Sequence, residues 1–123
     1  MPNPPRLAKK DLSHVNLATG DLTGADLHEA NLRHANLKET NLAGADLTRA
    51  DLTDANLGGA SLREATATDA NLEGADLRDV DLTGADLHGA RLDGAKLREP
   101  DRAGAMLAGA DLNSGEPDAT ESA

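Results

Sequence analysis

Leucine recurs at every fifth residue along almost the whole chain. Between residues 7 and 112 this phase offers 22 positions, and 20 of them are leucine. The two exceptions are Ala67 and Arg102, and no leucine lies outside the phase. Asp or Asn immediately precedes the phase position in 16 of the 22 units, and a small residue, usually alanine, precedes that. The repeating unit is therefore Ala-(Asp/Asn)-Leu, followed by two variable polar residues of which the second is often glycine.

A period of five fits neither an α-helix nor a flat strand. On a helix, successive leucines would lie about 140° apart, so they would not share one face. On a flat strand, alternate leucines would point to opposite sides of the sheet. The backbone must therefore bend once per unit, with the glycine-bearing pair at the corner and Ala and Leu on the inner face. The pattern predicts a solenoid of stacked coils.

The unit resembles that of the pentapeptide-repeat proteins, which is a small residue, Asp/Asn, Leu/Phe, Ser/Thr/Arg and Gly or a polar residue. The resemblance covers roughly residues 5–114. It implies an all-β fold, the right-handed quadrilateral β-helix, with four units and about twenty residues in each coil. Residue n would then stack on residue n+20, and the repeats would form about five and a half coils.

We predict three segments and a core built from leucine. The segments are a proline-rich lead-in at residues 1–10, the β-helix at residues 11–114, and a disordered acidic tail at residues 115–123. The predicted structural core consists of Leu17, Leu22, Leu27, Leu32, Leu37, Leu42, Leu47, Leu52, Leu57, Leu62, Leu72, Leu77, Leu82, Leu87, Leu92 and Leu97.

The two departures from leucine predict packing defects. Ala67 keeps the length of its unit but loses side-chain volume. We expect a cavity or a local pinch there, costing about 2–4 kcal/mol relative to leucine. Arg102 cannot be buried without a partner, so we expect its head to leave the core through a fraying C-terminal coil. Met106 would then be exposed beside it.

The stacking register also predicts which polar residues form columns. Asn16, Asn36 and Asn56 would form one column, whose amides could hydrogen-bond from coil to coil. Asp21, Asp81 and Asp101 would share another outward side. A basic column would contain Lys38, Arg78 and Arg98, with Gly58 interrupting it.

Composition excludes several classes of protein. The chain has no cysteine, which excludes a disulfide scaffold and a cysteine-based zinc finger. No apolar run is long enough for a signal peptide or a membrane span, so we predict a cytoplasmic protein that makes no membrane contact. These absences leave a thin, elongated core of Leu and Ala as the expected architecture.

The acidic charge is concentrated in the repeats. The net charge is −10, while residues 1–10 carry +3 and residues 113–123 carry −3, so the repeats carry all of it. Direct nucleic-acid binding is therefore not expected, because phosphates require cations. The candidate acidic interaction face consists of Asp21, Asp26, Asp46, Asp76, Asp81 and Asp86.

The resemblance implies one specific activity for such a face, which is mimicry of duplex DNA toward type II topoisomerases, conferring quinolone resistance. A rod of about 26 Å would carry roughly one net charge per 2.6 Å, against about one per 1.7 Å for duplex DNA. Its length corresponds to only about 8 base pairs. No long loop interrupts the repeats, whereas some topoisomerase-protecting members need such loops.

No constellation for catalysis or cofactor binding emerges from the sequence. His14 and His34 fall one coil apart with Asp54 above them, but this column supplies no further ligand, and we predict no metal site. Phosphate-binding loops and nucleophile motifs are also absent, so we predict no cofactor and no enzymatic activity.

The sequence thus favours a non-enzymatic protein-interaction or scaffold module with an unidentified protein partner. The alternative is an acidic DNA mimic that binds DNA gyrase or another type II topoisomerase. Because uncapped solenoid ends expose strand edges and apolar side chains, we also predict a homodimer through the C-terminal coil.

Overall fold

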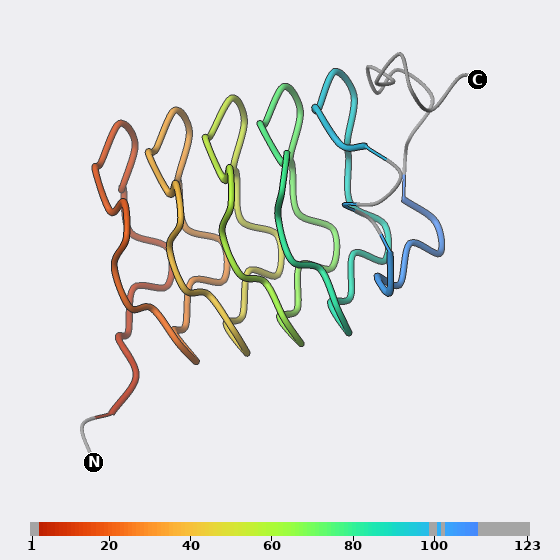
Figure 1. The fold of residues 1–123 in the computed structure, drawn as a ribbon. Coiled ribbons are helices and arrows are strands. Elements are labelled where there is room, and N and C mark those ends of the chain that lie inside the picture. Colours follow the sequence, from red (N-terminus) through yellow and green to blue (C-terminus); the bar gives the residue numbers. More distant parts are fainter. Residues whose placement is uncertain (1–2, 99–100, 102, 111–123) are drawn as a thin grey trace.

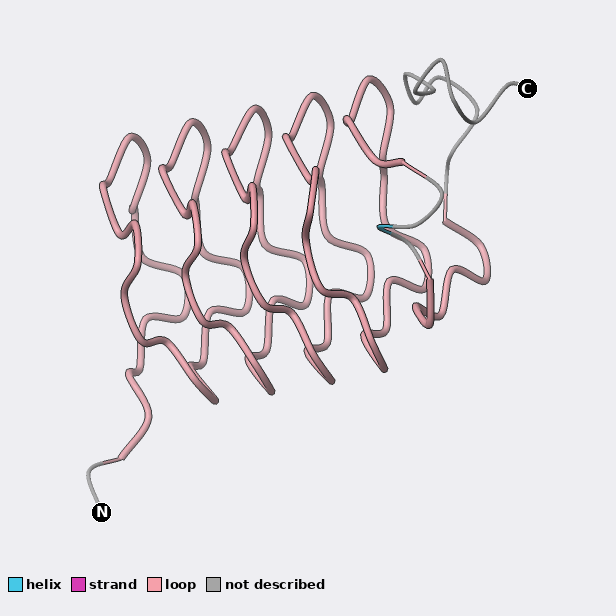
Figure 2. Ribbon diagram, viewed as in Figure 1, coloured by secondary structure: helices cyan, strands magenta, loops and turns pink. Residues whose placement is uncertain are grey.

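The computed structural model describes residues 3–98, 101 and 103–110. In these residues the chain winds into a rod of stacked four-sided coils (Figure 1). Each side of a coil contributes one extended residue, which forms a parallel bridge with the residue twenty positions later, as in the series Asn16, Asn36, Asn56. The described residues contain no longer strand, and their only helical residue, Asp101, adopts a 3₁₀ conformation (Figure 2).

Three backbone hydrogen bonds per unit join neighbouring coils. The N–H of Leu37 donates to the carbonyl of Asn56 at 2.7 Å, and the N–H of Asn56 donates to the carbonyl of Ala35 at 3.0 Å. At the corner, the N–H of Glu39 donates to the carbonyl of Gly58 at 2.9 Å. This repeated pattern satisfies the backbone without long strands, and it confirms the register of twenty residues per coil. The fold is a right-handed quadrilateral β-helix.

Each corner is a tight turn with one residue in the left-handed region. The N–H of Thr40 donates to the carbonyl of Leu37 at 3.1 Å, and Glu39 between them has a φ of 57°. A bond from residue i to i+3 with a positive φ at i+2 is the signature of a type II turn. Nine glycines and eleven other residues occupy this position with positive φ. The non-glycine residues there are strained, because the left-handed region crowds a Cβ atom.

Leucine and alanine fill the interior from both sides of each bridge. Fifteen of the sixteen leucines proposed for the core are buried, and the alanines two positions before them are buried with them. Leu17 is only partly buried, because it lies in the first coil, where no coil covers it from below. Thr40 is the one polar residue in this inner layer among residues 3–98, and its hydroxyl donates to the carbonyl of Leu17 at 2.8 Å.

The coil begins before the position expected from the sequence. Arg6 already pairs with Asp26, and the N–H of Leu7 donates to the carbonyl of Asp26 at 2.8 Å. The last five residues of the segment predicted as a lead-in thus take part in the ladder. The acidic tail at residues 115–123 lies outside the described residues. No helix among the described residues is long and apolar enough to cross a membrane.

Ala67 leaves a small void in an otherwise regular coil. The backbone ladder continues through it, because the N–H of Ala67 donates to the carbonyl of Asp86 at 2.7 Å. A cavity of about 10 Å³ lies against Ala67, Leu47 and Leu87, and only apolar side chains line it. A space of this size could hold one water molecule, but nothing in its walls can hydrogen-bond to it, so the cavity is dry. The cavity expected from the sequence is present.

The ladder departs from its regular pattern at Asp101 and Gly104. In regular corners, the backbone N–H of the second variable residue donates to the carbonyl of the residue nineteen positions later. Asp79 instead donates its N–H to the Oδ1 atom of Asp101 at 3.1 Å. The N–H of Gly84 donates to Gly104, one residue beyond the regular acceptor position, at 3.0 Å. The register returns with the bridge between Asp86 and Met106. Arg102 lies outside the described residues, so the fraying predicted for it stays a prediction.

The asparagine column differs from the expected amide ladder. The side chain of Asn36 accepts a hydrogen bond from the N–H of Lys38 at 3.1 Å, and that of Asn56 accepts one from Gly58 at 2.9 Å. Both side chains therefore close their own turns, and the expectation of amide bonds along this column is wrong for the described residues. Local hydrogen bonds from Asn side chains to the backbone of the same turn are typical of this residue.

Candidate acidic interaction surface

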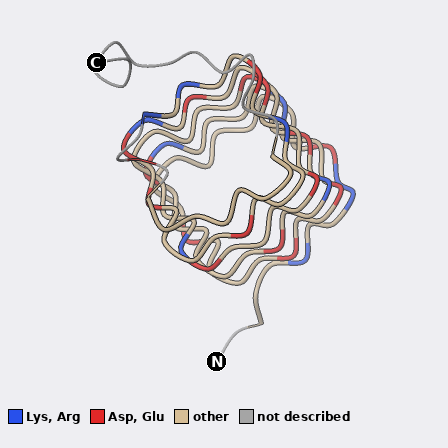
Figure 3. Ribbon diagram, turned by 90° about the vertical axis from the view of Figure 1, so that its right-hand side faces the viewer, with Lys and Arg blue, Asp and Glu red and all other residues tan. Residues whose placement is uncertain are grey.

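The six candidate aspartates lie on three different sides of the rod. We name each side by its first Asp or Asn. The Asp26 side contains Asp26, Asp46, Thr66 and Asp86, and the Asp21 side contains Asp21, Asn41, Ser61 and Asp81. The Asn16 side contains Asn16, Asn36, Asn56 and Asp76. The Asp11 side contains Asp11, Asn31, Asp51 and Asn71. Viewed along the rod, acidic and basic residues both occur around its outline (Figure 3). The candidates therefore do not form one continuous face.

Most of these aspartates also support the backbone. The Oδ1 atom of Asp46 accepts hydrogen bonds from the N–H of Thr48 at 3.0 Å and from its hydroxyl at 2.6 Å. Asp81 makes the same two bonds to Thr83, at 3.1 and 2.7 Å. The sequence Asp-Leu-Thr thus forms a local turn that uses one carboxylate oxygen, and in Asp81 the other oxygen accepts a hydrogen bond from Arg63 at 3.1 Å. This accounts for Asp and Thr recurring in the repeat without any reference to a partner.

The same hydrogen bonds keep the carboxylates charged. The hydroxyl of Thr23 and then its N–H lower the pKa of Asp21, and the same two groups of Thr83 lower the pKa of Asp81. For Asp76 the largest cause of the lowered pKa is the side-chain bond from Arg78. Hydrogen bonds to the ionised form favour it over the protonated form. These aspartates therefore carry their negative charge at every pH near neutrality.

The three sides differ in how far cations offset the acid. Asp76 pairs with Arg78 at 2.8 Å, and Asp81 pairs with Arg63 at 3.1 Å. On the Asp26 side, no Lys or Arg of the described residues forms an ion pair with Asp26 or Asp46. Opposite charges within a few ångströms reduce the field that a partner experiences. Asp26 and Asp46 thus lie on adjacent coils without such an ion pair, and Arg6, which bridges to Asp26 in the same column, brings one positive charge to this side.

Asp101 does not join the outward column predicted for it with Asp21 and Asp81. It is buried, with only 7% of its surface exposed, and its carboxylate receives bonds from the N–H of Asp79 and from Arg98. The Nε atom of Arg98 lies 2.8 Å from Asp101 Oδ2, and its Nη2 atom contacts Asp79 Oδ1. Both contacts raise the pKa of Arg98. The placement of Asp101 on an outward side was wrong because the register is lost here.

Arg98 and its column neighbours border a groove in the surface. The groove has a volume of about 540 Å³, and it lies over Gly58 and Gly59, between Lys38 on one side and Arg78 on the other. Two successive glycines leave a gap one coil high where other units carry side chains. Three cations and three carboxylates line it, so its net charge is close to zero. The groove therefore offers shape rather than charge to a ligand.

His14 and His34 stack on each other, as the register predicts. Their ring centroids lie 4.9 Å apart and the planes are inclined by 10°. The Nε2 atom of His34 is 3.9 Å from Asp54 Oδ2. Nitrogen lone pairs lie in the ring plane, so two parallel rings cannot direct theirs at one ion between them. This arrangement favours stacking over joint metal coordination.

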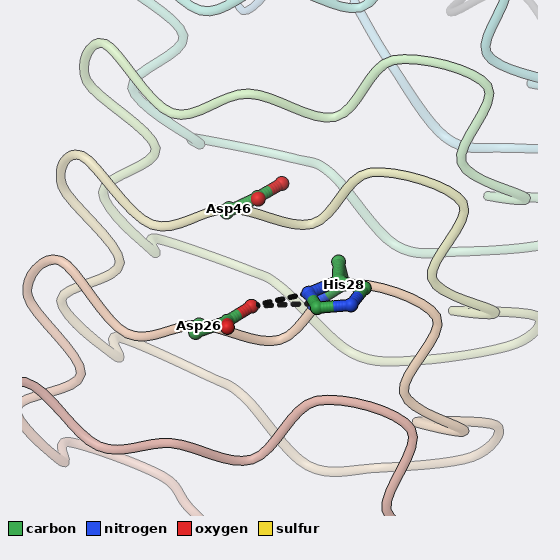
Figure 4. A group of neighbouring side chains, drawn as sticks. All are labelled: Asp26, His28 and Asp46. Carbon is green, nitrogen blue, oxygen red and sulfur yellow. Dashed lines mark hydrogen bonds and ion pairs between the residues drawn. The ribbon is translucent and has the colours of Figure 1, made fainter.

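A second histidine cluster was not found from the sequence. Asp26, His28 and Asp46 each offer a ligand atom, and these atoms lie within 4.8 Å of one another (Figure 4). The Nδ1 atom of His28 is 2.6 Å from Asp26 Oδ1. The signal that could have revealed the cluster is an Asp-x-His unit with a second Asp twenty residues after the first. It depends on the turn that folds His28 back toward Asp26.

Comparison with known proteins gives a consistent family assignment. The family model described as pentapeptide repeats matches in overlapping segments at residues 11–49, 30–66, 45–84, 60–98 and 75–113. A search of curated protein sequences finds no match.

Solved structures of similar proteins cover most of the chain. A pentapeptide repeat protein from the thylakoid lumen of Arabidopsis thaliana is 34% identical over 80% of this chain and 72% of its own, with a TM-score of 0.48. Rfr23, a pentapeptide repeat protein from the cyanobacterium Cyanothece 51142, is 29% identical over 93% of this chain and 88% of its own, with a TM-score of 0.49. QnrB1, a plasmid-mediated fluoroquinolone resistance protein, shares the fold at 18% identity, covering 95% of this chain and 66% of its own, with a TM-score of 0.54.

Proposed function

The chain belongs to the pentapeptide-repeat family, and on that premise we propose that it acts as a non-enzymatic protein-interaction module. The observation that carries this proposal is the division between inside and outside. Most units direct Leu and Ala inward and one Asp or Asn outward, at a repeat set by the ladder. A rod of this kind presents fixed rows of polar groups over its whole length, as extended solenoid binding surfaces do.

The interior supports binding at the surface rather than catalysis. The cavity at Ala67 is about 10 Å³, far below the volume that even a small substrate requires. The outward aspartates are stabilised in their charged form by turn hydrogen bonds, which is unfavourable for a general acid or base that must exchange protons near neutral pH. Both features agree with a module that recognises another protein.

We place the contact surface on the Asp26 side and propose a basic protein surface as the partner. Asp26 and Asp46 lie on adjacent coils, and neither forms an ion pair with a Lys or Arg of the described residues. Complementary charge raises the association rate and selects between partners. Direct binding to nucleic acid is not part of the proposal, since phosphates would be repelled.

The proposal is tested by removing charge from one side at a time. In the triple variant Asp26→Asn, Asp46→Asn, Asp86→Asn, the amide oxygens can still close the turns, as those of Asn36 and Asn56 do. The matched control, Asp21→Asn, Asp51→Asn, Asp81→Asn, removes three charges from the Asp21 and Asp11 sides. Proteins captured from host lysate by the wild type should be lost with the first variant and kept with the control. Equal capture by both variants would refute the assignment to the Asp26 side.

A second candidate is a DNA mimic that binds DNA gyrase. Carboxylates on adjacent coils of the Asp26 side favour it, since they resemble successive phosphates along a duplex. QnrB1 supports only the shared fold. A gyrase supercoiling assay separates the two candidates: inhibition that the Asp26-side variant abolishes supports mimicry, and no effect at high micromolar concentration excludes it.

We also propose a homodimer through the C-terminal coil. Met106 lies in this coil and leaves 53% of its surface exposed, the largest exposure of any large apolar residue that the structure describes. Sedimentation at increasing concentration should show association that Met106→Glu weakens, and a strict monomer at high concentration would contradict it. The cytoplasmic location predicted from the sequence stays a prediction.

A further inference from the structure

We propose that Asp26, His28 and Asp46 form a binding site for a divalent transition-metal cation that joins two neighbouring coils. The site shares Asp26 and Asp46 with the partner surface proposed above, but it is argued from the ligand geometry and does not require that a partner binds. It begins from three ligand atoms of different side chains that lie within 4.8 Å of one another (Figure 4). Two of them come from one unit, and the third comes from the unit stacked on it.

The first pair is arranged by the turn itself. The N–H of His28 donates to Asp26 Oδ1 at 3.3 Å, and this turn brings the imidazole Nδ1 atom to 2.6 Å from the same oxygen. A proton now lies between these two atoms. A cation in its place would contact both, because metal–nitrogen and metal–oxygen distances of about 2.0–2.2 Å separate the two donors by roughly 3 Å. Only a small opening of the pair is needed.

The second carboxylate is supplied by the ladder. Asp46 pairs with Asp26 through the backbone, so its side chain lies directly above on the next coil. Its Oδ1 atom is held by the N–H and hydroxyl of Thr48. Its other oxygen accepts no hydrogen bond from a described residue. The two carboxylates therefore approach the imidazole from adjacent levels, and neither must leave its turn.

The donor set indicates the class of metal. One imidazole nitrogen and two carboxylate oxygens suit Zn²⁺, Ni²⁺, Co²⁺ or Cu²⁺, whereas Mg²⁺ and Ca²⁺ prefer sites made only of oxygen. The side chains of Asp26 and His28 are 46% and 34% exposed, so water can complete the coordination shell. Such a site is open, and its affinity would be below that of a closed structural zinc site.

The cluster is not a general product of the repeat. Asp86 and His88 form the same Asp-x-His unit on the same side, and Asp86 Oδ1 accepts the N–H of His88 at 2.9 Å. However, the column neighbours of Asp86 are Thr66 and Met106, neither of which is a carboxylate. The described residues thus contain one such cluster and one Asp-x-His unit that lacks the second carboxylate. This second unit is a built-in control.

A bound cation would stabilise the N-terminal part of the rod. It would add a second side-chain link between two coils that the backbone ladder and the ion pair between Glu29 and Arg49 already connect. Because it would bind the folded chain and find no such arrangement in the unfolded chain, it should raise the melting temperature with increasing metal concentration.

The test measures Zn²⁺ binding to the full chain by isothermal titration calorimetry and the melting temperature with and without Zn²⁺. We expect one equivalent to bind and the melting temperature to rise. His28→Ala and Asp46→Asn should each weaken binding by at least about tenfold and remove the thermal shift. Asp46→Asn can keep its turn through the amide oxygen, so loss of binding would not reflect loss of fold; circular dichroism checks this.

The matched controls are His88→Ala and His34→Ala, which should leave both readouts unchanged. Binding that survives His28→Ala, or that is lost with His34→Ala instead, would overturn the assignment to this cluster. No heat and no thermal shift at millimolar Zn²⁺ with the wild type would overturn the site altogether.

Discussion

Ala67 and the segment from Arg98 to Gly104 both interrupt the leucine series, yet they differ in what is lost. At Ala67 the core loses volume while every backbone hydrogen bond of the unit remains, including the turn bond from the N–H of Ala70 to Ala67 at 3.1 Å. In the later segment the ladder bonds shift or disappear, and a buried carboxylate takes the place of a backbone acceptor. One gap is a packing defect, and the other is a change of register.

The difference follows from the residue that closes the turn. In the column Thr40, Ala60, Val80, each N–H donates to the leucine carbonyl three residues earlier. The next residue of this column is Pro100, and proline has no N–H to donate. A bond from the N–H of Asp101 to Arg98 at 3.0 Å forms instead, one residue later. The twenty-residue register thus survives the loss of side-chain volume in the core, whereas it is lost locally where the N–H that closes the turn is absent.

The largest expected effect comes from removing the carboxylate of the second gap. Asp101→Ala should destabilise the C-terminal coil by about 3 kcal/mol, because the N–H of Asp79 and the guanidinium of Arg98 both lose their partner. Amide hydrogen exchange should accelerate at Asp79 and Gly84 and remain slow at Leu37.

The near-isosteric variant Asp101→Asn is the control, since it retains an acceptor for the N–H of Asp79 but loses the charge opposite Arg98. Asp101→Asn should lower the free energy of unfolding clearly less than Asp101→Ala does. Equal losses of stability in the two variants would show that the segment is stabilised by the charge of Asp101, and not by the hydrogen bond that its side chain accepts from the N–H of Asp79.

The first gap should respond in the opposite direction. Ala67→Leu should stabilise the protein by about 2 kcal/mol, because it fills the apolar cavity and restores the column of Leu47 and Leu87. Urea denaturation measures the change. As a control, Ala55→Leu places the same side chain at a fully buried small position away from the cavity, and overpacking should destabilise it by about 1–3 kcal/mol. Destabilisation by Ala67→Leu would mean that the coil has closed around alanine.

A smaller effect tests the corners beside each gap. Glu64 and Asp79 both have positive φ, at 59° and 62°. Glu64→Gly should stabilise the rod by about 0.5–1 kcal/mol, because glycine adopts this conformation without strain. Asp79→Gly should gain nothing net, since it also removes the contact with Arg98. Thermal melts of the two variants make the comparison, and an equal gain in both would show that this ion pair contributes little.

The smallest effect concerns acid stability on the Asp21 side. The pKa of Asp81 is lowered in the folded chain, so its contribution is present above the unfolded value near 4 and is lost as pH falls through the lower folded value. Thr83→Val removes the hydroxyl bond, so the pKa of Asp81 should rise toward its ordinary value in an NMR titration. At neutral pH the loss of stability should not exceed about 0.5 kcal/mol. An unchanged pKa would assign the effect to Arg63.

Most of the fold could be predicted from the sequence, because a single spacing governs it. The five-residue period required one bend per unit, and the resemblance supplied four sides; together they placed Asn36 on Asn16 and His34 on His14. The cavity at Ala67 followed from side-chain volume alone. These features depend on local periodicity and size, which the sequence states directly.

The remaining features depend on geometry within the turn. The carboxylate of Asp101 lies inward where proline in the sequence removes the N–H that closes regular turns, and counting by twenty could not anticipate a local change of register. The Asp26–His28–Asp46 cluster needs the imidazole to fold back over its own unit, which spacing does not specify. The side chains of Asn36 and Asn56 likewise accept hydrogen bonds within their own turns and make none to the described residues of their column.

The register of twenty has a consequence for insertions and deletions. Removal of one unit would rotate every later residue by one side, so that residues now aligned with Asp46 would lie on a neighbouring side of the rod. Removal or duplication of four units would only shorten or lengthen the rod by one coil and leave every column aligned. Gene rearrangements in steps of sixty nucleotides therefore preserve the surface, while steps of fifteen nucleotides preserve the fold but permute its faces.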